Sequence, residues 1–239
     1  MQPLLALTNN RLVDDFPDPN TALSEPDGLL AAGGDLSQNF LINAYRRGIF
    51  PWYSDGQPIL WWCPSHRSVI TPGKVKVSRS LNKTLKRRIF EVKFDKNFAD
   101  VIEACAAPRA QQSDTWITNE MKRAYIQLHR NGYAHSVECY ANEELAGGLY
   151  GVALGRVFFG ESMFSRVSDA SKVALVSLSE SLRDWGYELI DCQIHNPHLA
   201  SMGASLVPRA EFLDRIAPLV DNYPKDSAWQ NDSIALNTN

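Results

Sequence analysis

Three polar side chains stand beside apolar, strand-like runs in the second half of the chain. Glu161 follows the run Val157–Phe159, and Asp191 and Gln193 close the run Tyr187–Gln193. A carboxylate can accept a proton or hold a cationic group, and an amide can hold an amine or a carbonyl oxygen. Such residues either form a functional site or serve as ion-pair and helix-cap partners, and the residues alone leave both interpretations open.

A strand–helix–strand unit is expected to position these side chains. Apolar residues recur between the two runs at helical spacing, at Leu175, Leu178, Leu182 and Trp185. Gly186 stands where such a helix would end. A crossover of this kind pairs its strands in parallel, and ligands gather near the carboxyl ends of such strands. We therefore expect Glu161, just past the first strand, to lie near Asp191 and Gln193, which share one face because they are two residues apart.

Length and composition predict a soluble globular protein of one large domain or two small ones. The 239 residues are 44% hydrophobic and 21% charged, with a net charge of −3. No apolar run approaches the roughly 20 residues of a membrane span, and the start of the chain lacks a secretory signal. The cysteines are scattered without metal-binding spacing, at Cys63, Cys105, Cys139 and Cys192. We expect a cytoplasmic protein without a metal site or disulfides, and with no membrane association.

The composition changes near Pro64–Pro72, and this segment is predicted to connect two domains. Residues 1–66 are expected to form a small α/β N-terminal domain and residues 67–239 a larger one. The tail past Asp221 is polar and is expected to fray.

Aromatic residues cluster shortly before this connection, in Ile49–Tyr53 and Ile59–Trp62. They either seal a small core or form the wall of a stacking or apolar pocket. Trp52 is the best candidate for a pocket wall because Pro51 holds it on a rigid connection.

A basic stretch without any acidic residue follows the connection. Its cations are Lys74, Lys76, Arg79, Lys83, Lys86, Arg87 and Arg88. Ser80–Arg88 fits a short helix with one cationic face, which would bind a phosphate backbone in a salt-dependent way. A solvated basic helix without a partner explains the pattern equally well.

The order of the predicted elements resembles the acetyltransferase-type, GNAT-like fold, which makes the fold class α+β. A strand at Ile89–Phe94 precedes two helices, three antiparallel strands and the crossover unit. Members of that fold hold a coenzyme in a glycine-rich loop before the crossover helix. Here that position is Gly160–Arg166, which lacks the glycine spacing. The sequence therefore predicts the scaffold without its coenzyme site.

Several separate motifs, spread over about residues 10–215, resemble those of the bacterial leucyl/phenylalanyl-tRNA–protein transferases. They are EPDGLLAAGGD at Glu25–Asp35, RGIFPW at Arg47–Trp52, ILWW at Ile59–Trp62, TWIT at Thr115–Thr118, GESMFSR at Gly160–Arg166, ASK at Ala170–Lys172 and LIDCQ at Leu189–Gln193.

The resemblance implies an aminoacyltransferase. Such an enzyme moves Leu or Phe, and less well Met, from aminoacyl-tRNA to the α-amine of proteins that begin with Arg or Lys. This modification marks the acceptor for degradation by the bacterial N-end rule. The resemblance also implies a GNAT-like C-terminal domain behind a small N-terminal domain, with no metal and no cofactor, and we expect a monomer.

The same resemblance assigns roles to the polar residues. The ester of aminoacyl-tRNA is already activated, so attack by an amine needs alignment and the loss of one proton. A free α-amine has a pKa of about 7.7–8.0, so a weak base suffices. Asp191 accepts that proton directly or through Gln193, or it only positions the amine, and both versions stay open. Glu161 is expected to hold the cationic acceptor by charge.

Binding residues follow from the resemblance as well. The aminoacyl pocket is expected at Leu149, Phe158, Leu178 and Ile190, and Trp52 and Trp116 are expected to flank the terminal adenosine. Leu149 and Leu178 stand where members of the family have the larger residues Met and Phe. The tRNA acceptor stem is expected to lie on Arg79, Lys83, Lys86, Arg87 and Arg88 without base readout.

Two other classes of function remain in view. An acyl-coenzyme A N-acyltransferase would share the scaffold, but the glycine loop is missing. A tRNA-binding module without catalysis would share the basic face, but it does not explain the cluster of Glu161, Asp191 and Gln193.

Overall fold

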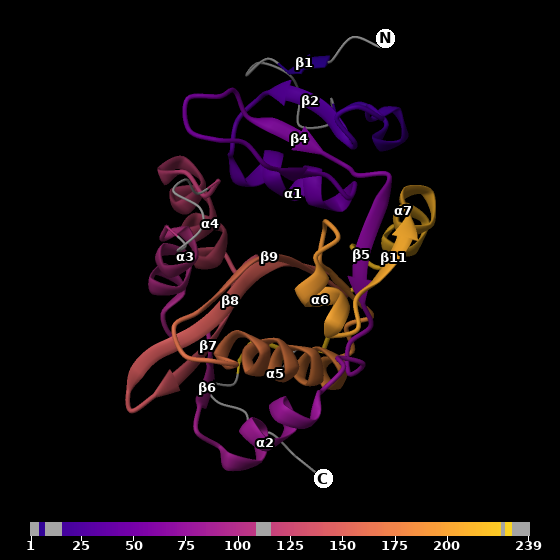
Figure 1. The fold of residues 1–239 in the computed structure, drawn as a ribbon. Helices are drawn as coiled ribbons and strands as arrows, with labels where there is room; N and C mark the ends of the chain where they lie inside the picture. The colour runs from indigo at the N-terminus through magenta and orange to yellow at the C-terminus, as the bar shows by residue number, and fades with distance from the viewer. Residues whose placement is uncertain (1–4, 8–15, 109–115, 226–227, 231–239) are drawn as a thin grey trace.

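The structure is a computed structural model that describes residues 5–7, 16–108, 116–225 and 228–230. The protein has a mixed α+β fold with two sheets (Figure 1). The first sheet has the order β1-β2-β4-β3. Its strands are β1 Leu5–Leu7, β2 Leu29–Gly33, β3 Phe50–Pro51 and β4 Leu60–Trp62. The short helices η1 (Pro19–Thr21) and α1 (Gln38–Arg46) belong to the same part of the chain.

The second sheet has seven strands in the order β11-β5-β10-β9-β8-β7-β6. They are β5 His66–Ile70, β6 Glu91–Phe94, β7 Ala134–Ala141, β8 Glu144–Leu154, β9 Val157–Ser165, β10 Leu189–Asp191 and β11 Ser205–Pro208. Strands β9 and β10 pair in parallel, and every other pairing in this sheet is antiparallel. The predicted meander of three consecutive antiparallel strands is confirmed in β7, β8 and β9.

Helices cover both faces of the seven-stranded sheet (Figure 1). They are α2 Arg79–Arg87, α3 Phe98–Ala106, α4 Asn119–Arg130, α5 Ala170–Trp185, α6 Pro197–Ser201 and α7 Arg209–Ile216. One core packs α1, α3 and α4 against one face, and it includes Phe159. The other core packs α2 and α5 against the opposite face, and it includes Phe158. Neighbouring residues of β9 thus serve different cores, because successive side chains of a strand point to opposite faces.

The predicted crossover of β9, α5 and β10 is confirmed. Helix α5 buries most of its side chains, including Leu178 and Trp185, because an amphipathic pattern at helical spacing turns one broad face to the sheet. Gly186 ends the helix with a φ of 89°, a left-handed conformation that glycine adopts without steric cost.

The prediction of a connection at Pro64–Pro72 is wrong for its centre. His66–Ile70 forms strand β5, which lies between β10 and β11 inside the larger sheet. The prolines at the ends of the segment bound this short strand and suggested a loop. The two sheets still separate between Trp62 and His66, but one core contains residues from both, so the division into domains stays a prediction.

Strand β9 is longer than predicted, and the extra length changes the position of Glu161 and leaves part of the strand edge uncovered. It continues to Ser165, so Glu161 lies inside the strand and not past its end. Along β9, strand β10 pairs only with the part Val157–Phe159, because β10 stops at Asp191. Beyond Phe159 the side of β9 that faces away from β8 has no strand beside it in the described sheet.

None of the described helices is long and apolar enough to cross a membrane.

Candidate active site

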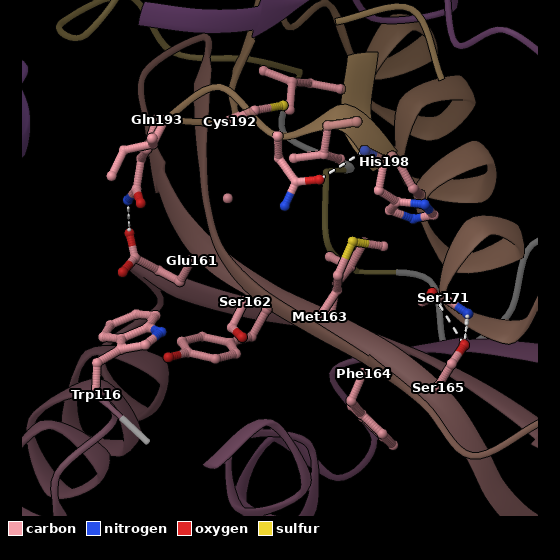
Figure 2. Close-up of a pocket in the computed structure, with 18 of the residues that line it drawn as sticks. Trp116, Glu161, Ser162, Met163, Phe164, Ser165, Ser171, Cys192, Gln193 and His198 are labelled. Atoms are coloured by element: carbon pink, nitrogen blue, oxygen red, sulfur yellow. Dashed lines mark hydrogen bonds between the residues drawn. The ribbon is translucent and has the colours of Figure 1, made fainter. Parts of the chain in front are cut away.

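A cavity of about 880 Å³ opens beside the part of β9 that β10 leaves uncovered (Figure 2). Its lining contains the whole segment Gly160–Arg166 and residues after β10 such as Gln193 and His198. Because the edge of β9 is open there, the cavity reaches side chains that belong to both faces of the sheet. The short β10 is therefore what creates room for a site.

Glu161 forms the polar centre of this cavity, and three side chains donate hydrogen bonds to its carboxylate. Tyr45 on α1 donates to Oε1 over 2.8 Å, and Tyr125 on α4 donates to Oε2 over 3.1 Å. The amide Nε2 of Gln193 donates to Oε1 over 2.7 Å, as Figure 2 shows. The two tyrosine hydroxyls also contact each other. Elements far apart in the sequence thus hold one carboxylate in place.

Burial raises the pKa of Glu161 to about 7, since its side chain is only 8% exposed. The hydroxyls of Tyr45 and Tyr125 oppose this rise because they stabilise the ionised form. The two tyrosines remain donors, because burial first and the nearby Glu161 second hold their pKa values well above 10. Glu161 can therefore change its charge near neutral pH.

Asp191 is fully buried and forms an ion pair with Arg67 on β5. The guanidinium donates from Nε to Oδ1 over 2.8 Å and from Nη2 to Oδ2 over 2.7 Å. Arg67 is also fully buried, donates to the carbonyl of Gly48 and lies over the rings of Phe50 and Phe212. This bidentate pair is rigid, because two parallel hydrogen bonds fix both planes.

Gln193 connects the two carboxylates. Its backbone N–H donates to Oδ1 of Asp191 over 2.8 Å, while its side chain reaches Glu161. Gln193 lies outside β10 and has a φ of 61°. The expectation that Asp191 and Gln193 share a strand face is therefore wrong, because the chain turns after Asp191 and the two-residue period no longer applies.

An apolar wall of the cavity contains the four residues predicted for a side-chain pocket. Leu149 on β8, Phe158 on β9, Leu178 on α5 and Ile190 on β10 all line it and are buried. Gly151 makes room for the ring of Phe158, since a Cβ there would be 2.6 Å from two ring carbons. The structure brings these four residues together, while their role stays a prediction.

The two predicted tryptophans also line the cavity. Trp52 follows β3, is 41% exposed and packs against Trp62 with ring centroids 5.7 Å apart. Trp116 precedes α4 and lies near Glu161 in Figure 2. Large rings that face a cavity offer stacking surfaces for a flat ligand.

The predicted basic helix forms as α2. Leu81 and Leu85 bury its apolar side, and Ser78 caps its start by accepting a hydrogen bond from the backbone N–H of Leu81. The five predicted cations are all exposed, at Arg79, Lys83, Lys86, Arg87 and Arg88. Within the described part of the chain, none of them forms an ion pair. This face is therefore available to a polyanion, and it lies beyond α5, away from the first sheet (Figure 1).

Sequence reasoning missed three residues of the site. Arg67 stands in the segment interpreted as a connection, and Tyr45 and Tyr125 stand among the buried, mostly apolar residues of their helices. A usable signal was present in the tyrosines, because a buried hydroxyl requires a hydrogen-bond partner.

The arrangement places a titratable carboxylate and an oriented amide beside an apolar cavity with aromatic rings at its rim. Such a site can hold a small apolar group, a flat ring and a cation at the same time. Tyr45, Tyr125 and Gln193 fix the carboxylate before any ligand arrives, so little reorganisation is needed during a reaction.

Comparisons with known proteins give a consistent result. The family model described as "Leucyl/phenylalanyl-tRNA protein transferase" matches residues 69–217, and the model described as its N-terminal domain matches residues 34–65. A protein of Nitrosospira multiformis named leucyl/phenylalanyl-tRNA–protein transferase is 56% identical over 214 residues, which are 90% of this chain and 92% of that protein. Proteins of the same name from Nitrosomonas europaea and Pseudomonas syringae pv. syringae are 58% and 54% identical, covering 91% and 92% of this chain and 92% and 96% of theirs.

Solved structures resemble the chain only distantly. A conserved protein of unknown function from Staphylococcus epidermidis covers 75% of this chain and 68% of its own, with a TM-score of 0.39 and 10% identity. A likeness at that level supports no assignment, so the GNAT-like relationship stays a prediction.

Proposed function

The chain belongs to the leucyl/phenylalanyl-tRNA–protein transferase family and is an aminoacyltransferase that moves amino acids from tRNA to proteins. On that premise we propose that it transfers Leu or Phe, and less well Met, to the α-amine of proteins that begin with Arg or Lys. The acceptor is thereby marked for the bacterial N-end rule. The observation that carries this proposal is the Glu161–Gln193 pair at the edge of an apolar cavity.

The apolar wall supports a small hydrophobic donor side chain. Leu149, Phe158, Leu178 and Ile190 would surround the aminoacyl group. Trp52 and Trp116 would stack on the terminal adenosine of the tRNA. A pocket of this kind separates side chains that differ by one methylene by only about 1–3 kcal/mol, so slower use of Met is expected.

Gln193 and Asp191 would align the reacting groups. The side-chain amide of Gln193 would hold the acceptor amine or the ester carbonyl, next to the bond that is broken. Asp191 is fully buried and paired with Arg67, which supports the positioning version of its role. It would orient Gln193 through the backbone N–H. The neutral fraction of the amine then attacks the ester carbon, and the tRNA ribose oxygen leaves with a proton.

Glu161 would hold the cationic first residue of the acceptor. Its carboxylate accepts three hydrogen bonds inside the protein, and a carboxylate has roughly four lone-pair sites, so one remains for a guanidinium or an ammonium. A charge-assisted hydrogen bond at that site would favour Arg and Lys over neutral residues.

The basic face of α2 would hold the acceptor stem by its phosphates. Its five exposed cations support affinity without base recognition. We also infer a GNAT-like scaffold from the order β6-α3-α4-β7-β8-β9-α5-β10, and a cytoplasmic monomer that needs neither metal nor cofactor.

The test is incubation of the protein with labelled Leu-tRNA or Phe-tRNA and a peptide that starts with Arg. We expect label in the peptide, with less label from Met-tRNA. The same peptide with an acetylated N-terminus, and one that starts with Gly, are the controls and should remain unlabelled. Equal labelling of the Gly peptide would refute the acceptor specificity. Acetylation of the Arg peptide from acetyl-coenzyme A, without transfer from tRNA, would favour the coenzyme-dependent class.

A further inference from the structure

The C-terminal tail does not fray at the residues that the structure describes beyond Asp221. The backbone N–H of Lys225 donates to the carbonyl of Trp185 over 3.0 Å, and its Nζ donates to the carbonyl of Asp184 over 2.6 Å. Ala228 donates to the carbonyl of Lys225 over 2.9 Å. These contacts anchor the tail at the end of α5 and direct Trp229 towards the larger sheet.

Trp229 enters an aromatic cluster formed by Phe94, His135, Phe158, Trp185 and Tyr187. Its indole stacks on His135 with ring centroids 4.0 Å apart and an interplanar angle of 9°. Asp95 holds His135 in turn, since its carboxylate lies 2.6 Å from Nδ1 of His135. The indole N–H donates to the hydroxyl of Tyr187 over 2.8 Å. Polar and stacking contacts therefore fix the ring in both position and orientation.

The backbone of Trp229 points to the same conclusion. Its φ of 63° lies in the left-handed region, which bulky residues rarely adopt. Such a conformation persists where surrounding contacts determine it, and it is concentrated at functional sites. Among the described residues, the contacts of the indole ring hold this conformation in place.

Phe158 links this cluster to the cavity. Among the rings around Trp229 it is the one that also lines the cavity, and its centroid lies 5.8 Å from that of Trp229 at an angle of 28°. The ring already rests on Gly151, where no Cβ could fit, so it has no freedom in that direction. The indole of Trp229 packs against the same ring, so shortening Trp229 would give Phe158 room to move.

We propose that Trp229 is a specificity-determining residue that sets the depth of the donor pocket by holding Phe158 in place. The inference rests on the proposed function, because it assumes that the cavity binds the aminoacyl side chain. Trp229 acts through Phe158 and is a positioning residue. If Trp229 is shortened, the ring of Phe158 moves back, the pocket deepens, and the larger donor side chain gains more than the smaller one.

The experiment compares kcat/KM for Leu-adenosine and Phe-adenosine, which lack the tRNA body, with an Arg-starting peptide as acceptor. In Trp229→Ala we expect the Phe-to-Leu ratio to rise about threefold to tenfold, a fraction of the 10–200-fold that one methylene can be worth. Trp229→Phe keeps an aromatic ring on His135 but loses part of the indole, so its ratio should lie between those of the wild-type protein and Trp229→Ala. Tyr223→Ala, an 81% exposed residue of the same tail, is the matched control and should leave the ratio unchanged.

The outcomes separate the inference from its premise. If the wild-type protein transfers neither Leu nor Phe, the proposed function fails first. If it transfers both and folded Trp229→Ala loses rate equally with the two donors, Trp229 only stabilises the fold and the inference is wrong. If Trp229→Ala does not fold, Trp229→Phe decides, because removal of the indole benzo ring should still raise the ratio measurably. A wild-type ratio in Trp229→Phe, with Trp229→Ala unfolded or unshifted, overturns the proposal.

Discussion

At the scale of single residues, the site contains two carboxylates in very different surroundings, joined by one amide. Asp191 is paired with a cation and enclosed, whereas Glu161 faces the cavity and has its pKa raised to about 7 by burial. Two carboxylates with such different surroundings often have different roles in a site. Here the separation supports Asp191 as the residue that positions Gln193 and Glu161 as the residue that meets the ligand.

The role of Asp191 can be tested with Asp191→Asn. The variant leaves the buried guanidinium of Arg67 without its counter-charge, so we expect a loss of stability that approaches the roughly 3–5 kcal/mol of a broken buried pair. Misplacement of Gln193 should lower kcat by about 10²-fold, and by the same factor at every pH, because alignment does not titrate. The measurements are denaturant unfolding and kcat from pH 6 to 9.

Arg67→Lys tests the same positioning role from the other side of the ion pair. It keeps the positive charge but loses the bidentate hydrogen bonds to Asp191. It should show the same pH-independent loss of kcat. Wild-type kcat in Arg67→Lys, together with a loss in Asp191→Asn of about 10²–10⁴-fold that shrinks as the pH rises, would instead establish Asp191 as the base.

The raised pKa of Glu161 predicts that binding of the acceptor depends on pH. Because its pKa is raised to about 7, the carboxyl is largely neutral below that pH and anionic above it. An N-acetylated Arg peptide keeps its guanidinium charge throughout and has no titrating amine. Its inhibition constant should therefore fall as the pH rises from 6 to 8. We expect about a tenfold change, in line with the value of one charged hydrogen bond.

In Glu161→Gln this pH dependence should disappear, with weak binding at every pH. An N-acetylated Gly peptide, measured in parallel with the wild-type protein, should show no comparable change. If Glu161→Gln binds the Arg peptide as tightly as the wild-type protein at pH 8, Glu161 does not hold the acceptor.

At the scale of elements, we propose that α2 binds the tRNA while the residues of the cavity carry out the transfer. Replacing Lys83, Lys86 and Arg87 together by Ala removes three exposed charges and leaves the buried Leu81 and Leu85 in place. We expect weaker binding of aminoacyl-tRNA and a slope of log K against log salt that is shallower by about 2–3, since each phosphate contact contributes roughly 0.9. Transfer from aminoacyl-adenosine should change little.

The control for net charge is a variant in which three exposed arginines of other elements are replaced by Ala. They are Arg46, Arg130 and Arg215. Its salt slope should match that of the wild-type protein. Equal losses in both triple variants would show that overall charge, and not the face of α2, governs the binding of tRNA.

At the scale of the whole molecule, the two sheets share one core. Tyr45 and Trp61 from the first part of the chain are fully buried in the same cluster as Tyr125 and Phe159 from the second. Tyr45 also donates to Glu161, and Trp52 lines the cavity, so the first part contributes to the site as well as to stability.

We therefore predict that the full chain unfolds in one cooperative transition. Far-ultraviolet circular dichroism and tryptophan fluorescence should give coincident denaturation curves, because neither part can bury its share of the core alone. A chain that starts at residue 67 should bind a dye for exposed apolar surface and show no sharp transition. Two separate transitions in the full chain would instead support independent domains.

The sequence by itself determined several of the regular elements and the family. The helical spacing of Leu175, Leu178 and Leu182, closed by Gly186, predicts α5 and the crossover correctly. Such signals are local, because burying an apolar stripe or ending a helix depends on residues within a few turns. The motifs around Glu161 and Asp191 likewise predicted the family, since residue identity and order carry that information without coordinates.

Only the tertiary structure decided which groups meet. Strand β10 ends at Asp191, which opens the edge of β9 and turns Gln193 out of the strand towards Glu161. The partner of Asp191 is Arg67, more than a hundred residues away in a segment whose prolines suggested a loop. The tail that was expected to fray places Trp229 against Phe158. Each of these is a pairing between distant segments, and such pairings depend on how the elements pack, which no local pattern specifies.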